Sequence, residues 1–171
     1  DLVKLLSHEN GWFRKTAQRL LFQRGDKNIA SALSDVVRSD AEYGPVAALW
    51  LLHDWGILGP KDLEHALKSD LEGVRENALQ LADRMMQKPG FKGNSVLNES
   101  LIALADDPSA RVRFQWICSS SYLSLPKMAE LKAKILTKDI DDHWTGIAAI
   151  ASSQGAEYEL LKFSTKAMGA T

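Results

Sequence analysis

The chain has 171 residues, of which 45% are hydrophobic and 25% charged, and this composition is typical of a folded globular protein rather than a disordered one. The formal net charge of -1 argues against a dedicated nucleic-acid-binding protein, because such proteins normally carry a basic excess. The single cysteine, Cys118, excludes an internal disulfide and any Cys-x-x-Cys site.

The beginning of the chain resembles the last turns of a helix. It opens at Asp1-Leu-Val-Lys-Leu-Leu6 without an initiator Met or a signal peptide, so we interpret the chain as a fragment or processed piece of a larger protein. A membrane-spanning helix needs about eighteen consecutive apolar residues, and the sequence contains no such run. We therefore expect no membrane insertion by this segment.

One pattern recurs along the chain and is clearest from Asp70 to Leu81. An acidic residue is followed four positions later by an apolar residue, then by Arg, and further on by Ala and Leu. Weaker copies place the small residue of this pattern at positions 17, 48, 78, 116 and 148, with Trp116 as the exception in size. The nearly constant interval of about thirty residues is typical of stacked supersecondary units.

Each unit is predicted to contain two helices, since apolar residues recur three and four positions apart before and after each turn. No stretch alternates with period two, so we predict no sheet. The predicted fold is an all-α right-handed superhelix, or solenoid, of about five helix pairs in one domain over residues 1–171. The predicted units are 1–26, 27–58, 59–90, 91–124 and 125–155, followed by a helix at 156–167.

The turns carry residues that begin helices. Ser69 and Glu72 have the spacing of a capping box, and Asp107-Pro108 predicts a capping acid before a proline at the first helical position. A Pro/Gly-rich loop at 87–94 accounts for the one long interval between units. Further predicted starts lie at Asn10-Gly11, Pro60, Pro126 and Asp141-Asp142.

The acidic residue and the Arg recur together, at Asp70 and Arg75 and again at Asp107 and Arg113. We expect a structural ladder in which each Arg reaches the acid of its own turn or of the next one, because a guanidinium fits a carboxylate in a bidentate manner. This interpretation is favoured over a ligand-binding role, also for Arg14.

These residues resemble the HEAT repeat in the short form found in phycobilisome-lyase-like proteins. The resemblance rests on Asp70 to Leu79 and on Asp106 to Arg113, and it covers essentially the whole chain, weakly in the second and fifth units. It implies a helical-repeat scaffold.

A narrower resemblance concerns Asn10 to Asp26 and Ala47 to His53, which look like the helical-repeat segment of planctomycete-type membrane-bound dehydrogenase proteins. That family usually has a β-propeller before the repeats and a c-type haem domain after them. The resemblance implies a periplasmic or extracellular parent with oxidoreductase activity. The chain has no Cys-x-x-Cys-His motif, so we expect no cofactor in this segment.

We predict no catalytic or metal-binding residue. The four histidines, His8, His53, His65 and His143, match no helical metal pair, and no base accompanies Cys118. Among the five tryptophans, Trp116 and Trp144 are expected in the core because they occupy apolar positions of the repeat. The candidates for a partner-binding surface are Trp12, Arg14, Gln18, Arg19, His53 and Trp55.

The sequence therefore favours a non-catalytic scaffold or protein-interaction module whose partner is a protein. The alternative is a HEAT-like DNA glycosylase or another nucleic-acid-binding enzyme, against which the balanced charge argues. A bilin-handling role is implied only by the repeat subtype.

Overall fold

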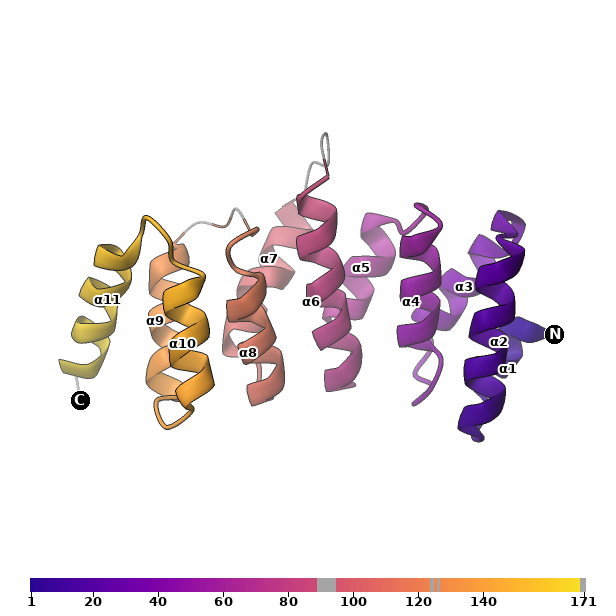
Figure 1. The fold of residues 1–171 in the computed structure, drawn as a ribbon, viewed down its shortest axis with the longest axis horizontal. Helices are drawn as coiled ribbons and strands as arrows, with labels where there is room; N and C mark the ends of the chain where they lie inside the picture. The colour runs from indigo at the N-terminus through magenta and orange to yellow at the C-terminus, as the bar shows by residue number, and fades with distance from the viewer. Residues whose placement is uncertain (89–94, 124, 126, 170–171) are drawn as a thin grey trace. The chain divides into compact units, whose positions relative to one another are not determined.

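The computed structural model describes residues 1–88, 95–123, 125 and 127–169, and within these ranges the chain is all-helical without any β-strand (Figure 1). The prediction of an all-α protein is therefore confirmed. The chain divides into two compact units, Asp1–Leu81 and Ala82–Thr171, with the division inside one helix. The single repeat domain stays a prediction.

In the N-terminal unit the helices pack against helices that are near them in the chain. α1 packs against α2 and α3, α2 packs against α4, and α3 packs against α4 and α5. Leucines such as Leu6, Leu33 and Leu49 are fully buried between these helices. The elements of this unit are α1 (Leu2–Leu5), α2 (Gly11–Arg24), the 3-10 helix η1 (Lys27–Ile29), α3 (Ala30–Val37), α4 (Pro45–Asp54), α5 (Pro60–Leu67) and the first part of α6 (Glu72–Met86).

The C-terminal unit repeats this sequential packing. α9 packs extensively along α11, α8 packs against α10, and the fully buried Trp116 donates from Nε1 to the Leu101 carbonyl at 2.7 Å. After the end of α6 the elements are α7 (Ser95–Ala103), the 3-10 helix η2 (Leu104–Asp106), α8 (Ala110–Ser119), α9 (Met128–Lys138), α10 (His143–Ala151) and α11 (Glu157–Gly169).

The bounds of each predicted unit enclose two of the observed α-helices, and α11 covers the stretch of the last helix; the division into repeat units stays a prediction. Asn10 and Asp142 cap α2 and α10, and Pro60 is the first residue of α5. The Ser69 hydroxyl accepts from the backbone N–H of Leu71 at 3.3 Å. Pro126 and most of the predicted loop, residues 89–94, lie outside the described residues.

The prediction for the start of α8 is wrong. This helix begins at Ala110 with Ser109 as its N-cap, so Pro108 precedes the helix instead of occupying its first position. The Asp107 carboxylate accepts from the backbone N–H of Ser109 at 2.8 Å and shapes the turn before the helix. The acid therefore stabilises the turn before the helix and does not cap the helix itself.

The predicted column of small residues lies in the core of the first four units, where Ala17, Ala48, Ala78 and Trp116 are all buried. In the fifth unit the column is shifted by one residue, because Ala149 is fully buried whereas Ala148 is half-buried. Thr145, the first core residue of α10, lies six positions after Asp139, whereas Val74 lies four positions after Asp70. The longer turn rotates α10 and leaves Trp144 67% exposed, so the prediction of Trp144 in the core is wrong.

Three arginines of the repeat contact the turn that precedes their own helix. In each case Nη1 donates to the backbone carbonyls five and six residues earlier, at distances from 2.6 to 3.0 Å. Within its own turn the Arg therefore bonds the backbone. The pairs of carbonyls are those of His8 and Glu9 for Arg14, of Ser69 and Asp70 for Arg75, and of Asp107 and Pro108 for Arg113.

Arg113 also reaches the acid of the next turn, which is the second arrangement expected of the ladder. Its Nε donates to the Asp139 carboxylate at 2.7 Å, and its Nη2 forms an ion pair with the same group. Both side chains are almost completely buried, and the hydrogen bonds to Asp139 raise the pKa of the Arg113 guanidinium. One side chain thus joins the turn before α8 to the end of α9.

We expect Ala149→Asp to lower the free energy of unfolding by at least about 3 kcal/mol, because it places an unpaired carboxylate between packed helices. Ala148→Asp is the matched control one residue away, and its cost should be much smaller because this position is half-buried. Urea unfolding followed by circular dichroism measures both. A larger cost for Ala148→Asp than for Ala149→Asp would show that α10 has the register predicted from the sequence.

Arg113→Ala should cost about 3–5 kcal/mol of stability, since it leaves the buried Asp139 carboxylate and two carbonyls without their donor. Arg14→Ala removes the same pair of carbonyl contacts at an exposed site and should cost no more than about 1 kcal/mol. Arg113→Lys should recover only part of the loss, because an ammonium cannot form the bidentate contact. Thermal and urea unfolding of the three variants test this order of stability.

Candidate protein-binding surfaces

Exposed aromatic side chains gather at the start of α2. Trp12 is 66% exposed, and its ring meets the ring of Phe13 edge to face with 5.1 Å between the centroids. The Arg14 guanidinium lies 3.9 Å from the centroid of the exposed Tyr43 ring, a cation–π contact. We call Trp12, Phe13, Arg14 and Tyr43 the aromatic surface.

A pocket of about 280 Å³ adjoins the aromatic surface, and it is lined by Arg14 and Gln18 of α2 and by Tyr43 among others. Gly44 follows Tyr43 with φ of +111°, and a Cβ there would lie 2.4 Å from the Ser7 hydroxyl oxygen. Only glycine fits this turn, which positions Tyr43 beside α2. A hydrogen bond from the phenol to Glu42 raises the pKa of Tyr43.

The predicted site residues are only partly brought together. Arg14 and Gln18 line this pocket, and Trp12 and Arg19 are exposed on the same helix. His53 is at the end of α4, where its side chain is 13% exposed and its Nδ1 lies 3.1 Å from the Asp54 carboxylate. It does not line the pocket.

The prediction of Trp55 as a surface residue is wrong. Trp55 is the C-cap residue of α4, the chain reverses at Gly56 with φ of +70°, and the Trp55 side chain is only 8% exposed. The Gly56 that follows Trp55 at the end of α4 therefore does not indicate an exposed ring, because the Trp55 ring is buried. Trp50, on the preceding turn of α4, donates from Nε1 to the Asn77 amide oxygen at 2.8 Å.

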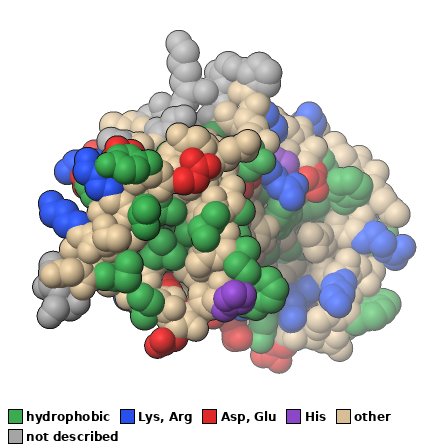
Figure 2. Space-filling model, turned by 60° about the vertical axis from the view of Figure 1, so that its left-hand side comes forward, with side chains coloured by type: hydrophobic (Ala, Val, Ile, Leu, Met, Phe, Trp, Pro, Cys, Tyr) green, Lys and Arg blue, Asp and Glu red, His purple; other side chains and the backbone are tan. Residues whose placement is uncertain are grey.

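A second surface lies on α10. Trp144 and Ile150 are each 67% exposed, and Ile147 between them is 43% exposed. We call these three residues the α10 surface. Figure 2 shows hydrophobic side chains gathered on the face of the C-terminal helices that is turned towards the viewer.

Sequence reasoning missed Ile147 and Ile150, although a signal was present. From position 143 to position 156 the chain contains no Asp, Glu, Lys or Arg. A helix of nine residues buries only Thr145 and Ala149, so an uncharged helix of this length must leave apolar side chains in water.

Trp12 and Trp144 occupy equivalent positions. Each is the second residue of the second helix of its pair, and each is about two-thirds exposed. The backbone N–H of Trp12 donates to the Asn10 side chain at 2.9 Å, and that of Trp144 donates to the Asp142 carboxylate at 3.0 Å. A hydrogen bond from the Thr145 hydroxyl and a second one from the Trp144 N–H lower the pKa of Asp142. The cap therefore fixes the backbone from which each exposed ring projects.

Among the described residues, no three His, Cys, Asp or Glu side chains lie close enough together to hold a metal ion. Cys118 is an exposed residue, but the desolvation of its thiol by neighbouring groups raises its pKa. An activated thiol has the opposite shift. None of the described helices has both the length and the apolar character that crossing a membrane requires.

Comparison with known proteins adds no assignment to these surfaces, because no protein-family model matches the chain and no curated protein matches it significantly.

Proposed function

We propose that this chain is a non-catalytic protein-binding module in which the helix pairs form a HEAT-like solenoid. The aromatic surface and the α10 surface are its contacts with a protein partner. The observation that carries the proposal is the pair of exposed tryptophans, Trp12 and Trp144, at equivalent capped positions. Each tryptophan places an exposed aromatic ring at the start of the second helix of its pair, and such a ring is an effective anchor for a protein partner.

The chemistry of both surfaces supports a protein partner. Tryptophan, tyrosine and arginine dominate the binding energy of protein interfaces, and all three occur in the aromatic surface. The α10 surface has the uncharged, apolar character of an interface centre. Large aromatic side chains lose little conformational entropy on binding, which makes them effective anchors.

The proposal extends to the parent protein through the resemblance of Asn10 to Asp26. In that case the module would hold domains of a larger periplasmic, dehydrogenase-like protein relative to each other or to a separate partner. Redox chemistry would then belong to domains outside this chain.

Trp12→Ala and Trp144→Ala should each weaken partner binding about 30-fold without loss of stability, because both rings are largely exposed. To identify the partner, a photoreactive phenylalanine analogue is introduced at position 144 in cells of the source organism, with exposed Asp35 of α3 as the control position. We expect one cross-linked protein at position 144 and none at position 35. Calorimetry with that purified protein then measures the affinities.

Two results would contradict the proposal. One is an affinity of the purified partner that neither tryptophan substitution changes. The other is tight, salt-dependent binding of the chain to duplex DNA in a fluorescence anisotropy titration, which would favour the nucleic-acid alternative.

A further inference from the structure

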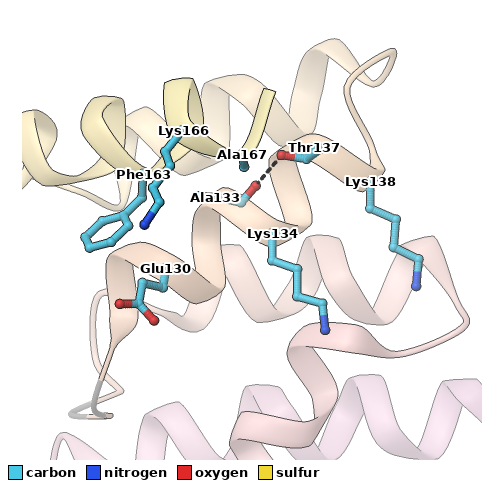
Figure 3. A pocket seen from close by; sticks show the side chains of 8 residues that line it. All are labelled: Glu130, Ala133, Lys134, Thr137, Lys138, Phe163, Lys166 and Ala167. Atoms are coloured by element: carbon cyan, nitrogen blue, oxygen red, sulfur yellow. Dashed lines mark hydrogen bonds between the residues drawn. The ribbon is translucent and has the colours of Figure 1, made fainter. Parts of the chain in front are cut away.

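A groove separate from both protein-binding surfaces lies between α9 and α11. It has a volume of about 490 Å³, which falls in the usual range of small-molecule sites, and its lining is almost entirely apolar. Figure 3 shows the side chains that line it. They are Glu130, Ala133, Lys134, Thr137 and Lys138 of α9, and Phe163, Lys166 and Ala167 of α11.

Short side chains create this groove. Ala133 and Ala167 form its floor between two helices that pack closely along their length, and Phe163 forms one wall. The Thr137 hydroxyl donates to the Ala133 carbonyl at 2.9 Å, so its polar atom is turned to its own helix rather than to the groove. The side chains of Ala133, Ala167 and Phe163 therefore offer hydrocarbon contacts to a ligand, and the Thr137 hydroxyl donates within its own helix.

The rim of the groove is cationic. Lys134 and Lys138 both reach the Asp106 carboxylate, at 2.9 and 3.3 Å, and these contacts lower the pKa of Asp106. Glu130 lies 4.0 Å from the Lys127 ammonium. Each of these charged groups already has an opposite charge close by.

Lys166 is different. Among the described residues it has no ion-pair partner, and Figure 3 shows its side chain directed into the groove between Phe163 and Ala133. Lysine normally extends its ammonium into water and leaves its methylenes against apolar surface. Lys166 is an exposed residue at the edge of the apolar floor, where its ammonium can pair with an anion whose own body covers that floor.

We propose that this groove binds a single-chain anionic amphiphile, namely a carboxylate with an unbranched alkyl chain. The chain lies on Ala133, Ala167 and Phe163, and the carboxylate pairs with the Lys166 ammonium. Asp106 shows that carboxylates already pair with lysines of this rim. The lined part of α9 runs from Glu130 to Lys138 and is about 12 Å long, so it suits one alkyl chain of medium length.

The groove differs in chemistry from the proposed protein-binding surfaces. The α10 surface has no charged residue, whereas the groove combines an apolar floor with three lysines. This inference does not rest on the proposed protein binding, and either can fail without the other.

Decanoate tests the proposal, with decanol and decyltrimethylammonium as neutral and cationic analogues of the same chain. We expect decanoate to bind with a Kd below about 1 mM in titration calorimetry with the full chain, and to do so more tightly than both analogues. Amide NMR shifts should change in α9 and α11 and not in α2. Lys166→Gln should weaken decanoate about tenfold and leave decanol unchanged.

Two further variants locate the site. Ala167→Trp should abolish the binding of all three probes because the ring fills the groove, and the far-ultraviolet circular dichroism spectrum reports whether the variant is folded. Lys88→Gln removes one exposed charge at the end of α6, outside the groove lining, and should leave decanoate binding unchanged.

The proposal is overturned by any of four results. These are no binding of decanoate, equal binding of the three probes, shifts outside α9 and α11, or binding that Lys88→Gln weakens as much as Lys166→Gln does. Binding of phosphatidylglycerol vesicles through Lys166 without binding of free decanoate would also overturn it, because the occupant would then be a membrane surface.

Discussion

The repeated contact between an arginine and the turn before its helix is the interaction on which three of the predicted helix pairs depend. A turn between two packed helices carries backbone carbonyls that no helix satisfies, and leaving such groups unpaired costs free energy. Arg14, Arg75 and Arg113 each supply donors to two of these carbonyls. The Arg bonds the carbonyls of its turn, and the acid of the turn accepts from other donors, as when the Asp107 carboxylate accepts from the Ser109 N–H.

The turns also decide which residues the second helices expose. A turn sets the rotation of the helix that follows it, so two extra residues after Asp139 rotate α10 enough to exchange the roles of Trp144 and Thr145. The fifth copy has Thr145 where its expected pattern would place Arg, and the turn is held instead by Arg113 of the preceding copy through Asp139. A structural ion pair in one repeat is thereby coupled to the exposed surface of the next.

Helix positions and helix starts could be predicted because their causes are local. Apolar periodicity and caps such as Asn10 and Asp142 act within one turn of helix. The exposure of Trp144 and the burial of Trp55 could not be predicted, since both depend on how a turn orients the chain against other helices. The groove between α9 and α11 could not be predicted either, because nothing in either helix alone indicates that Ala133 and Ala167 line the same groove.

Exposed tryptophans are a liability for a soluble protein, because contiguous apolar surface promotes aggregation. One of the two surfaces limits this liability with a charge. The aromatic surface includes the Arg14 guanidinium over Tyr43, which keeps a cation beside the exposed rings. The α10 surface has no such charge, so it has the stronger thermodynamic requirement for a covering partner. The groove between α9 and α11 has lysines at its rim, whereas the α10 surface has none. For this reason we expect an anionic ligand in the groove and a protein contact on the α10 surface.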